Sequence, residues 1–100
     1  MVRIEEGMLA RSLAGHDQGR LYVIIRRDAE YVWLVDGFLR TVERPKKKKI
    51  RHIQVIHRLA EPVKKALERG TPPGDDEIRQ IIQSESRDRQ EDKHVESRCN

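Results

Sequence analysis

The sequence has little of what builds cross-linked, metal-bound or membrane-spanning proteins. Its one cysteine, Cys99, excludes an internal disulfide framework and a multi-cysteine zinc site, and it favours a reducing compartment. No apolar run approaches the roughly 18 residues that cross a bilayer. The start, MVRIEEG, lacks the apolar segment of a signal peptide. We therefore expect a cytoplasmic protein that is not inserted in a membrane.

The composition is highly charged, and the charge is unevenly distributed. Charged residues make up 38% of the 100 residues and hydrophobic ones 36%, so we expect one small domain with one core and a part that stays unpacked. Residues 1–60 carry 13 Lys and Arg against 7 Asp and Glu, whereas residues 61–100 carry 8 against 10. A compact basic module is typical of a polyanion binder, although charge also keeps a small domain soluble.

Short β-type runs separated by turn signals fill the first half of the chain. Run 20–27 is apolar on both faces, which predicts a strand that is buried on both sides or sharply coiled. Asp36-Gly37 is a strong hairpin signal. Five short strands at this spacing predict a small antiparallel barrel. The strand candidates are residues 7–12, 20–27, 31–35, 38–43 and 50–56.

The pattern changes after residue 56. Apolar residues every fourth position from Leu59 to Leu67 predict a short helix with Pro62 in its first turn. After a TPPG linker, Asp75 or Asp76 is a candidate cap for a second helix. The predicted organisation is a barrel over 1–56, a helical extension over 57–83 and a disordered polar tail over 84–100.

The densest charge is the run Lys46–Lys49. With Arg44 and Arg51, six of the eight residues from 44 to 51 are cationic. Pro45 disfavours a continuing strand, and like charges at every position cannot be buried, so we expect a connecting loop. Four extended residues span about 13 Å, enough to lie along several phosphates without reading sequence. A solvated loop that protects a sheet edge and a nuclear import label are the alternatives.

A second loop, LAGHDQGR, has Gly15 and Gly19 on either side of a tight turn before Arg20. Glycines let a backbone approach a ligand closely. The spacing matches neither a nucleotide-phosphate loop nor a dinucleotide fingerprint. Taken alone, this segment is explained better by an ordinary turn loop than by a binding loop.

Three segments in one order carry a family resemblance: GMLARSLAGHDQGR, VDGFLR and RPKKKKIRHI. They resemble the KOW-motif RNA-binding proteins. More specifically, the chain is similar to their bacterial branch, which is related to a ribosomal protein family of the archaeal and eukaryotic large subunit, number fourteen in that nomenclature. The resemblance covers about residues 5–56. It departs from the usual motif at Gln18, Tyr22 and His16.

The resemblance implies an SH3-like five-stranded barrel that binds structured RNA, ribosomal RNA in particular, as a ribosomal or ribosome-associated component. It implies no catalysis, and we expect no cofactor. The alternative is an SH3-like protein-interaction module of the translation or transcription machinery that docks through its C-terminal helices. The residues expected to meet RNA are Gly15, His16, Gly19, Arg20, Arg40, Arg44, Lys46, Lys47, Lys48, Lys49, Arg51 and His52.

Aromatic side chains are scarce, with four in the chain. Single-strand binders stack bases on such rings, so the scarcity favours recognition of the backbone and shape of folded RNA. We expect Trp33 to face the core, whereas Phe38, just after the hairpin signal, is a candidate for an exposed stacking ring.

No constellation of residues indicates a metal site or catalysis. The four histidines have no i,i+4 partner on a convincing helix and no cysteine nearby, so we expect no metal centre. Nucleophile and paired-carboxylate patterns are also missing, so we expect a protein that is not an enzyme. The histidines are His16, His52, His57 and His94.

Overall fold

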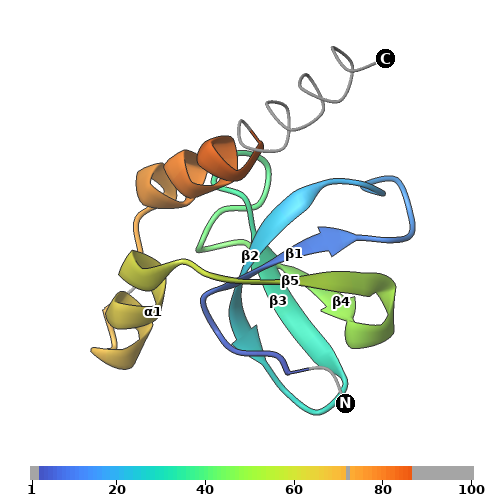
Figure 1. The fold of residues 1–100 in the computed structure, drawn as a ribbon, viewed down its shortest axis with the longest axis horizontal. Coiled ribbons are helices and arrows are strands. Elements are labelled where there is room, and N and C mark those ends of the chain that lie inside the picture. Colours follow the sequence, from blue (N-terminus) through green and yellow to red (C-terminus); the bar gives the residue numbers. More distant parts are fainter. Residues whose placement is uncertain (1–2, 72, 87–100) are drawn as a thin grey trace, which may run out of the picture.

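Within residues 3–71 and 73–86, which the computed structural model describes, five antiparallel strands curl into a half-barrel and two helices lie beside it (Figure 1). The strand order is β4-β3-β2-β1-β5, which confirms the mainly β, five-stranded antiparallel fold. The finer assignment to the SH3-like KOW type stays a prediction. The elements are β1 (Met8–Ser12), β2 (Leu21–Arg27), β3 (Tyr31–Val35), β4 (Lys46–Lys49), a 3-10 turn (Ile50–His52), β5 (Ile53–Leu59), α1 (Glu61–Glu68) and a second helix over residues 75–86.

The fourth strand does not lie where the sequence predicted it. Residues 38–43 form turns and bends, because Asp36 Oδ1 accepts the backbone N–H groups of both Phe38 and Arg40 and coils the chain there. The lysine run forms β4 instead, paired with β3 at the edge of the sheet. The prediction of a connecting loop is therefore wrong. Side chains alternate across a strand, so only every second lysine has to face the interior.

Strand β2 is buried on both faces, as its sequence predicts. Tyr22 and Ile24 face one hydrophobic cluster, and Leu21 and Val23 face another. The expectation of a single core is wrong, because the helices cover the second face of the sheet. The cluster on the helix side contains Leu9, Leu21, Val23, Val35, Ala60, Val63, Ile78 and Ile82.

Both helices form, with bounds that differ from the prediction. Strand β5 continues to Leu59, beyond residue 56, and the second helix continues to residue 86, beyond residue 83. This helix begins at residue 75, and its first hydrogen bond joins the Ile78 N–H to the Gly74 carbonyl, so Asp75 and Asp76 lie inside its first turn. Residues 87–100 of the predicted tail lie outside the described residues, as does the side chain of His57.

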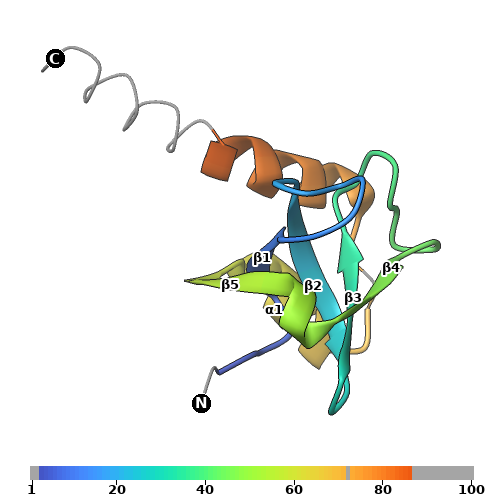
Figure 2. The ribbon, with the colours of Figure 1, turned by 90° about the vertical axis from the view of Figure 1, so that its right-hand side faces the viewer.

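The second helix runs beside the loop that joins β3 to β4, as Figure 2 shows from the side. The Val42 N–H donates to Asp75 Oδ1, and Arg79 donates to the Gly37 carbonyl. These contacts fix the segment that leads into β4. None of the helices among the described residues is long and apolar enough to cross a membrane.

Candidate nucleic-acid interface

The four lysines of β4 divide between the two faces of the sheet. In the β3–β4 register, Lys46 lies opposite Leu34 and Lys48 opposite Val32, whose side chains are in the cluster away from the helices. Lys47 lies opposite Trp33 on the other face. The four lysines therefore do not form one surface.

The inner lysines bind a carboxylate of the β1–β2 loop. Lys48, only 9% exposed, places Nζ 2.8 Å from Asp17 Oδ1 and 2.8 Å from the Ala14 carbonyl oxygen. Lys46 places Nζ 3.0 Å from Asp17 Oδ2. One carboxylate faces two ammonium groups, so the inner pair keeps at most one uncompensated positive charge. These two lysines chiefly attach the loop to β4.

Asp17 is the centre of this network. Its carboxylate also accepts hydrogen bonds from Ser12 Oγ at 2.9 Å and from the Tyr22 hydroxyl at 2.8 Å. Burial alone would raise the pKa of Asp17, but hydrogen bonds from Lys48, Lys46, Tyr22 and Ser12 outweigh it and hold that pKa well below its usual range. Burial and the Asp17 carboxylate raise the pKa of Tyr22. Asp17 is therefore ionised at neutral pH, and Tyr22 is neutral.

The outer face of β3 and β4 carries a cation–aromatic cluster made of Arg26, Tyr31, Trp33 and Lys47. Lys47 Nζ lies 4.4 Å from the centroid of the Tyr31 ring and 5.4 Å from that of Trp33. Arg26 Cζ lies 4.7 Å from the Trp33 centroid. Trp33 is only half-buried, so the expectation that it faces the core is wrong. Cross-strand pairing places Arg26, Trp33 and Lys47 in one row across β2, β3 and β4.

The cluster presents positive charge that the described part of the chain does not neutralise. Within those residues, Lys47 and Arg26 form no ion pair; both rest against rings. Each cation–π contact contributes about 0.5–1 kcal/mol at an exposed site. The rings also restrict two long side chains, whose ordering costs up to about 2 kcal/mol each. A phosphate that binds here meets cations whose mobility is already reduced.

Asp28 supplies some opposing charge to the cluster. Its pKa is lowered chiefly by two local hydrogen bonds, and the charges of Lys47 and Arg26 add to the effect. Asp28 Oδ1 accepts the backbone N–H groups of Glu30 at 2.9 Å and Tyr31 at 2.7 Å, which closes the β2–β3 turn. The Asp28 carboxylate thus stabilises the turn through these hydrogen bonds and forms no ion pair with the cluster.

Two glycines of the β1–β2 loop adopt a backbone conformation that other residues rarely take. Gly15 and Gly19 have φ of 85° and 88°, in the left-handed region that disfavours other residues. His16 is exposed between them. Arg20 is partly engaged, because its Nε lies 3.2 Å from Oδ2 of the buried Asp36. The loop therefore offers His16 and backbone groups to a ligand and uses Arg20 to hold the β3–β4 loop.

The remaining predicted residues flank β4. Arg40 and Arg44 are exposed on the loop before it, Lys49 is exposed at its end, and Arg51 is exposed in the 3-10 turn after it. His52 is half-buried, and its carbonyl accepts the Leu13 N–H, so it is chiefly structural.

Sequence reasoning missed Arg26, Tyr31 and Trp33 as members of the site. The sequence did contain a sign of this site, because a turn at residues 28–30 folds the chain back and brings Arg26 opposite the strand that holds Tyr31 and Trp33. The register shift between Ile24 and Arg26 hides the pairing from a simple count.

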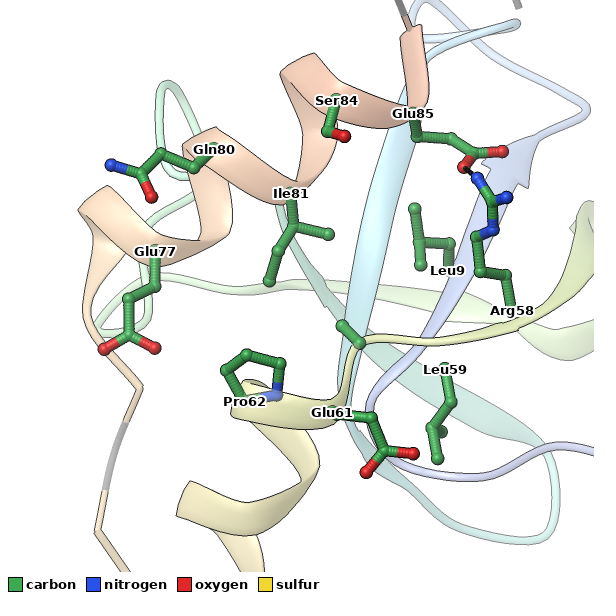
Figure 3. Close-up of a pocket in the computed structure, with 11 residues that line it drawn as sticks. Leu9, Arg58, Leu59, Glu61, Pro62, Glu77, Gln80, Ile81, Ser84 and Glu85 are labelled. Atoms are coloured by element: carbon green, nitrogen blue, oxygen red, sulfur yellow. Dashed lines mark hydrogen bonds and ion pairs between the residues drawn. The ribbon is translucent and has the colours of Figure 1, made fainter. Parts of the chain in front are cut away.

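A pocket of about 570 Å³ opens between β1, β5, α1 and the second helix (Figure 3). Apolar side chains from β1, β5, α1 and the second helix form its floor, including Leu9, Leu59 and Ile81. Glu61 and Glu77 stand on its rim, and Arg58 forms an ion pair with Glu85 at one end. The pocket is a candidate protein-binding surface. Its lining carries three carboxylates against one arginine, which does not suit a polyanion.

Residues 3–71 and 73–86 contain no group of three or more His, Cys, Asp or Glu side chains that could hold a metal ion. In comparisons with known proteins, no family model matches the chain, and no curated protein matches it either.

Proposed function

We propose that this protein is a non-catalytic RNA-binding module of the KOW type that its sequence resembles, and that its partner is ribosomal RNA. The observation that carries the proposal is the cation–aromatic cluster on the outer face of β3 and β4. Four further exposed cations lie in β4 or in the segments just before and after it. They are Arg40, Arg44, Lys49 and Arg51.

Such a surface suits the backbone of a nucleic acid. Lys47 and Lys49 are two residues apart on one strand, about 6.6 Å, so they meet separate phosphates. Lysine is a mobile point charge, and phosphate contacts fix register without reading bases. The module then recognises the shape and charge of folded RNA.

Crosslinking in cells tests this proposal, with sequencing of the attached RNA. The expected result is enrichment of ribosomal RNA, strongly reduced in a Lys47→Gln/Lys49→Gln variant. The matched control is Lys65→Gln/Arg69→Gln, which removes two exposed charges from α1 and its end and should leave crosslinking unchanged. If the outer-face variant crosslinks as well as the wild type, this surface does not bind RNA.

The second candidate function is a protein-interaction module, which the apolar pocket between β5, α1 and the second helix favours. Sedimentation of ribosomes with and without ribonuclease separates the two functions. An RNA-bound protein leaves the ribosomal fraction after digestion or at high salt. Association that survives both treatments, and that is lost in Ile81→Asp, assigns the binding to a protein partner.

A further inference from the structure

We infer that the β3–β4 loop carries a stacking tip, Phe38 and Leu39, that packs against an unpaired nucleotide of the bound RNA. The inference rests on the proposed function and adds a class of ligand to it, an unpaired base beside a duplex. It also gives the second helix a role, which is to hold this tip in place.

The tip is exposed and apolar. Leu39 is 71% exposed and Phe38 is 50% exposed, and the two residues are adjacent in the chain. Only one other large apolar side chain in the described residues is comparably exposed, Leu13. Neighbouring exposed apolar residues on one loop are typical of a contact surface.

The loop beneath the tip is held rigidly. Asp36 Oδ1 accepts the backbone N–H groups of Phe38 and Arg40, each at 2.9 Å. Oδ2 of the same carboxylate pairs with Arg20. From the helix, Arg79 donates to the Gly37 carbonyl at 2.6 Å. An apolar pair that is fixed before binding loses little conformational freedom when a ligand arrives.

Gly37 shows how closely the helix supports the loop. Its φ is 79°, and a Cβ added there would lie 2.6 Å from the Asp75 carbonyl oxygen and 2.7 Å from Arg79 Cγ. The loop backbone therefore rests directly on the helix. Arg79 continues past this contact, with Cζ 5.7 Å from the centroid of the Phe38 ring, and it also pairs with Asp76.

The surroundings of the tip favour a nucleobase over an apolar protein pocket. Arg40 and Arg44 are exposed on the same loop, and the loop leads directly into β4. Its carboxylates are Asp36, which is buried and paired, and the exposed Glu43. A ring with cations around it stacks on a base while they meet the flanking phosphates. Bases within a duplex are already stacked, so the ligand must be a bulged or looped-out nucleotide.

The test compares an RNA duplex with the same duplex carrying a bulged 2-aminopurine, whose fluorescence falls when it stacks on a ring. Wild-type protein should bind the bulged RNA about tenfold more tightly, in line with one stacking contact, and should quench the fluorophore. Phe38→Ala should lose the preference and the quenching while keeping its affinity for the duplex. Phe38→Tyr should retain both. Arg79→Met should weaken the preference by loosening the loop.

The outcomes separate this inference from the proposed function. If the wild type binds neither RNA, the proposed function is wrong and the inference falls with it. If it binds both equally, with an affinity that depends on Lys47 and Lys49, only the tip is wrong. If Phe38→Ala binds both RNAs as the wild type does but no longer sediments with ribosomes, the tip contacts a protein and the inference is overturned.

Discussion

Neutralising two lysines should affect RNA binding on one face of β4 and stability on the other. Lys47→Gln/Lys49→Gln removes two exposed charges, and Lys46→Gln/Lys48→Gln removes two that face Asp17. Each neutralised phosphate contributes about 0.7 to the slope of log affinity against log salt for single-stranded RNA, and about 0.9 for a duplex if the B-DNA value applies. The outer variant should therefore flatten the slope by about 1.4 to 1.8.

The inner variant should behave differently. At most one of its charges is uncompensated, so the slope should change by less than about 0.9. Its stability should fall instead, because Asp17 is only 8% exposed and loses both cationic partners. Breaking a buried ion pair costs about 3 kcal/mol, which lowers the melting temperature of a domain this small by more than about 10 °C. The outer variant loses only cation–π contacts and should melt within a few degrees of the wild type.

Fluorescence anisotropy over a range of KCl concentrations measures the slopes, and circular dichroism measures the melting temperatures. If the inner variant flattens the slope more than the outer one does, Lys47 and Lys49 are not the main phosphate contacts of β4. If the inner variant melts like the wild type, Asp17 does not hold the loop to β4. A four-lysine variant alone would not distinguish the two faces.

Three further predictions concern stability. Asp17→Asn should destabilise the fold by about 3 kcal/mol. Because the pKa of Asp17 is lower in the folded than in the unfolded state, its stabilising contribution is complete above about pH 5 and is lost as the pH falls. Acid titrations should therefore show a smaller loss of stability in the variant. Gly37→Ala should lower the free energy of unfolding, measured in urea, by at least about 2 kcal/mol, because the φ of Gly37 is positive and a Cβ would meet the Asp75 carbonyl oxygen. Gly70→Ala should lower it by less, because the φ there is also positive but the space around Gly70 is open. Ile78→Ala should lower the free energy of unfolding by about 3 kcal/mol, since this side chain is fully buried against the sheet. If Ile81→Ala destabilises the protein more than Ile78→Ala does, the second core is not packed as described.

The strand content of the first half was predictable because β-branched runs and turns alternate there. Strand β2 even showed that both of its faces are buried, since Leu21 and Val23 alternate with Tyr22 and Ile24. The sequence did not show what covers the second face. Helix propensity alone cannot tell a packed helix from an appended one, and the partners of β2 lie about 40 to 60 positions further on.

The role of the lysine run was not predictable from local pattern. Its strand conformation depends on β3, and the burial of Lys48 depends on Asp17, which is 31 positions away. A single residue such as Asp17 in a glycine-containing loop carries no sign of its partner. The direction of Trp33 was hidden for a similar reason, because its face is fixed by pairing with Arg26 beyond an irregularity in β2.

The two-sided burial of β2 has a consequence for how the chain is made. Synthesis completes the sheet at Leu59, yet the apolar face formed by Leu21, Val23 and Val35 stays bare until Ile78 and Ile82 have been added. A nascent chain that pauses in this interval exposes a hydrophobic surface that is prone to aggregate. The packed unit thus extends beyond residue 56, and a chain truncated there should expose the second core and aggregate.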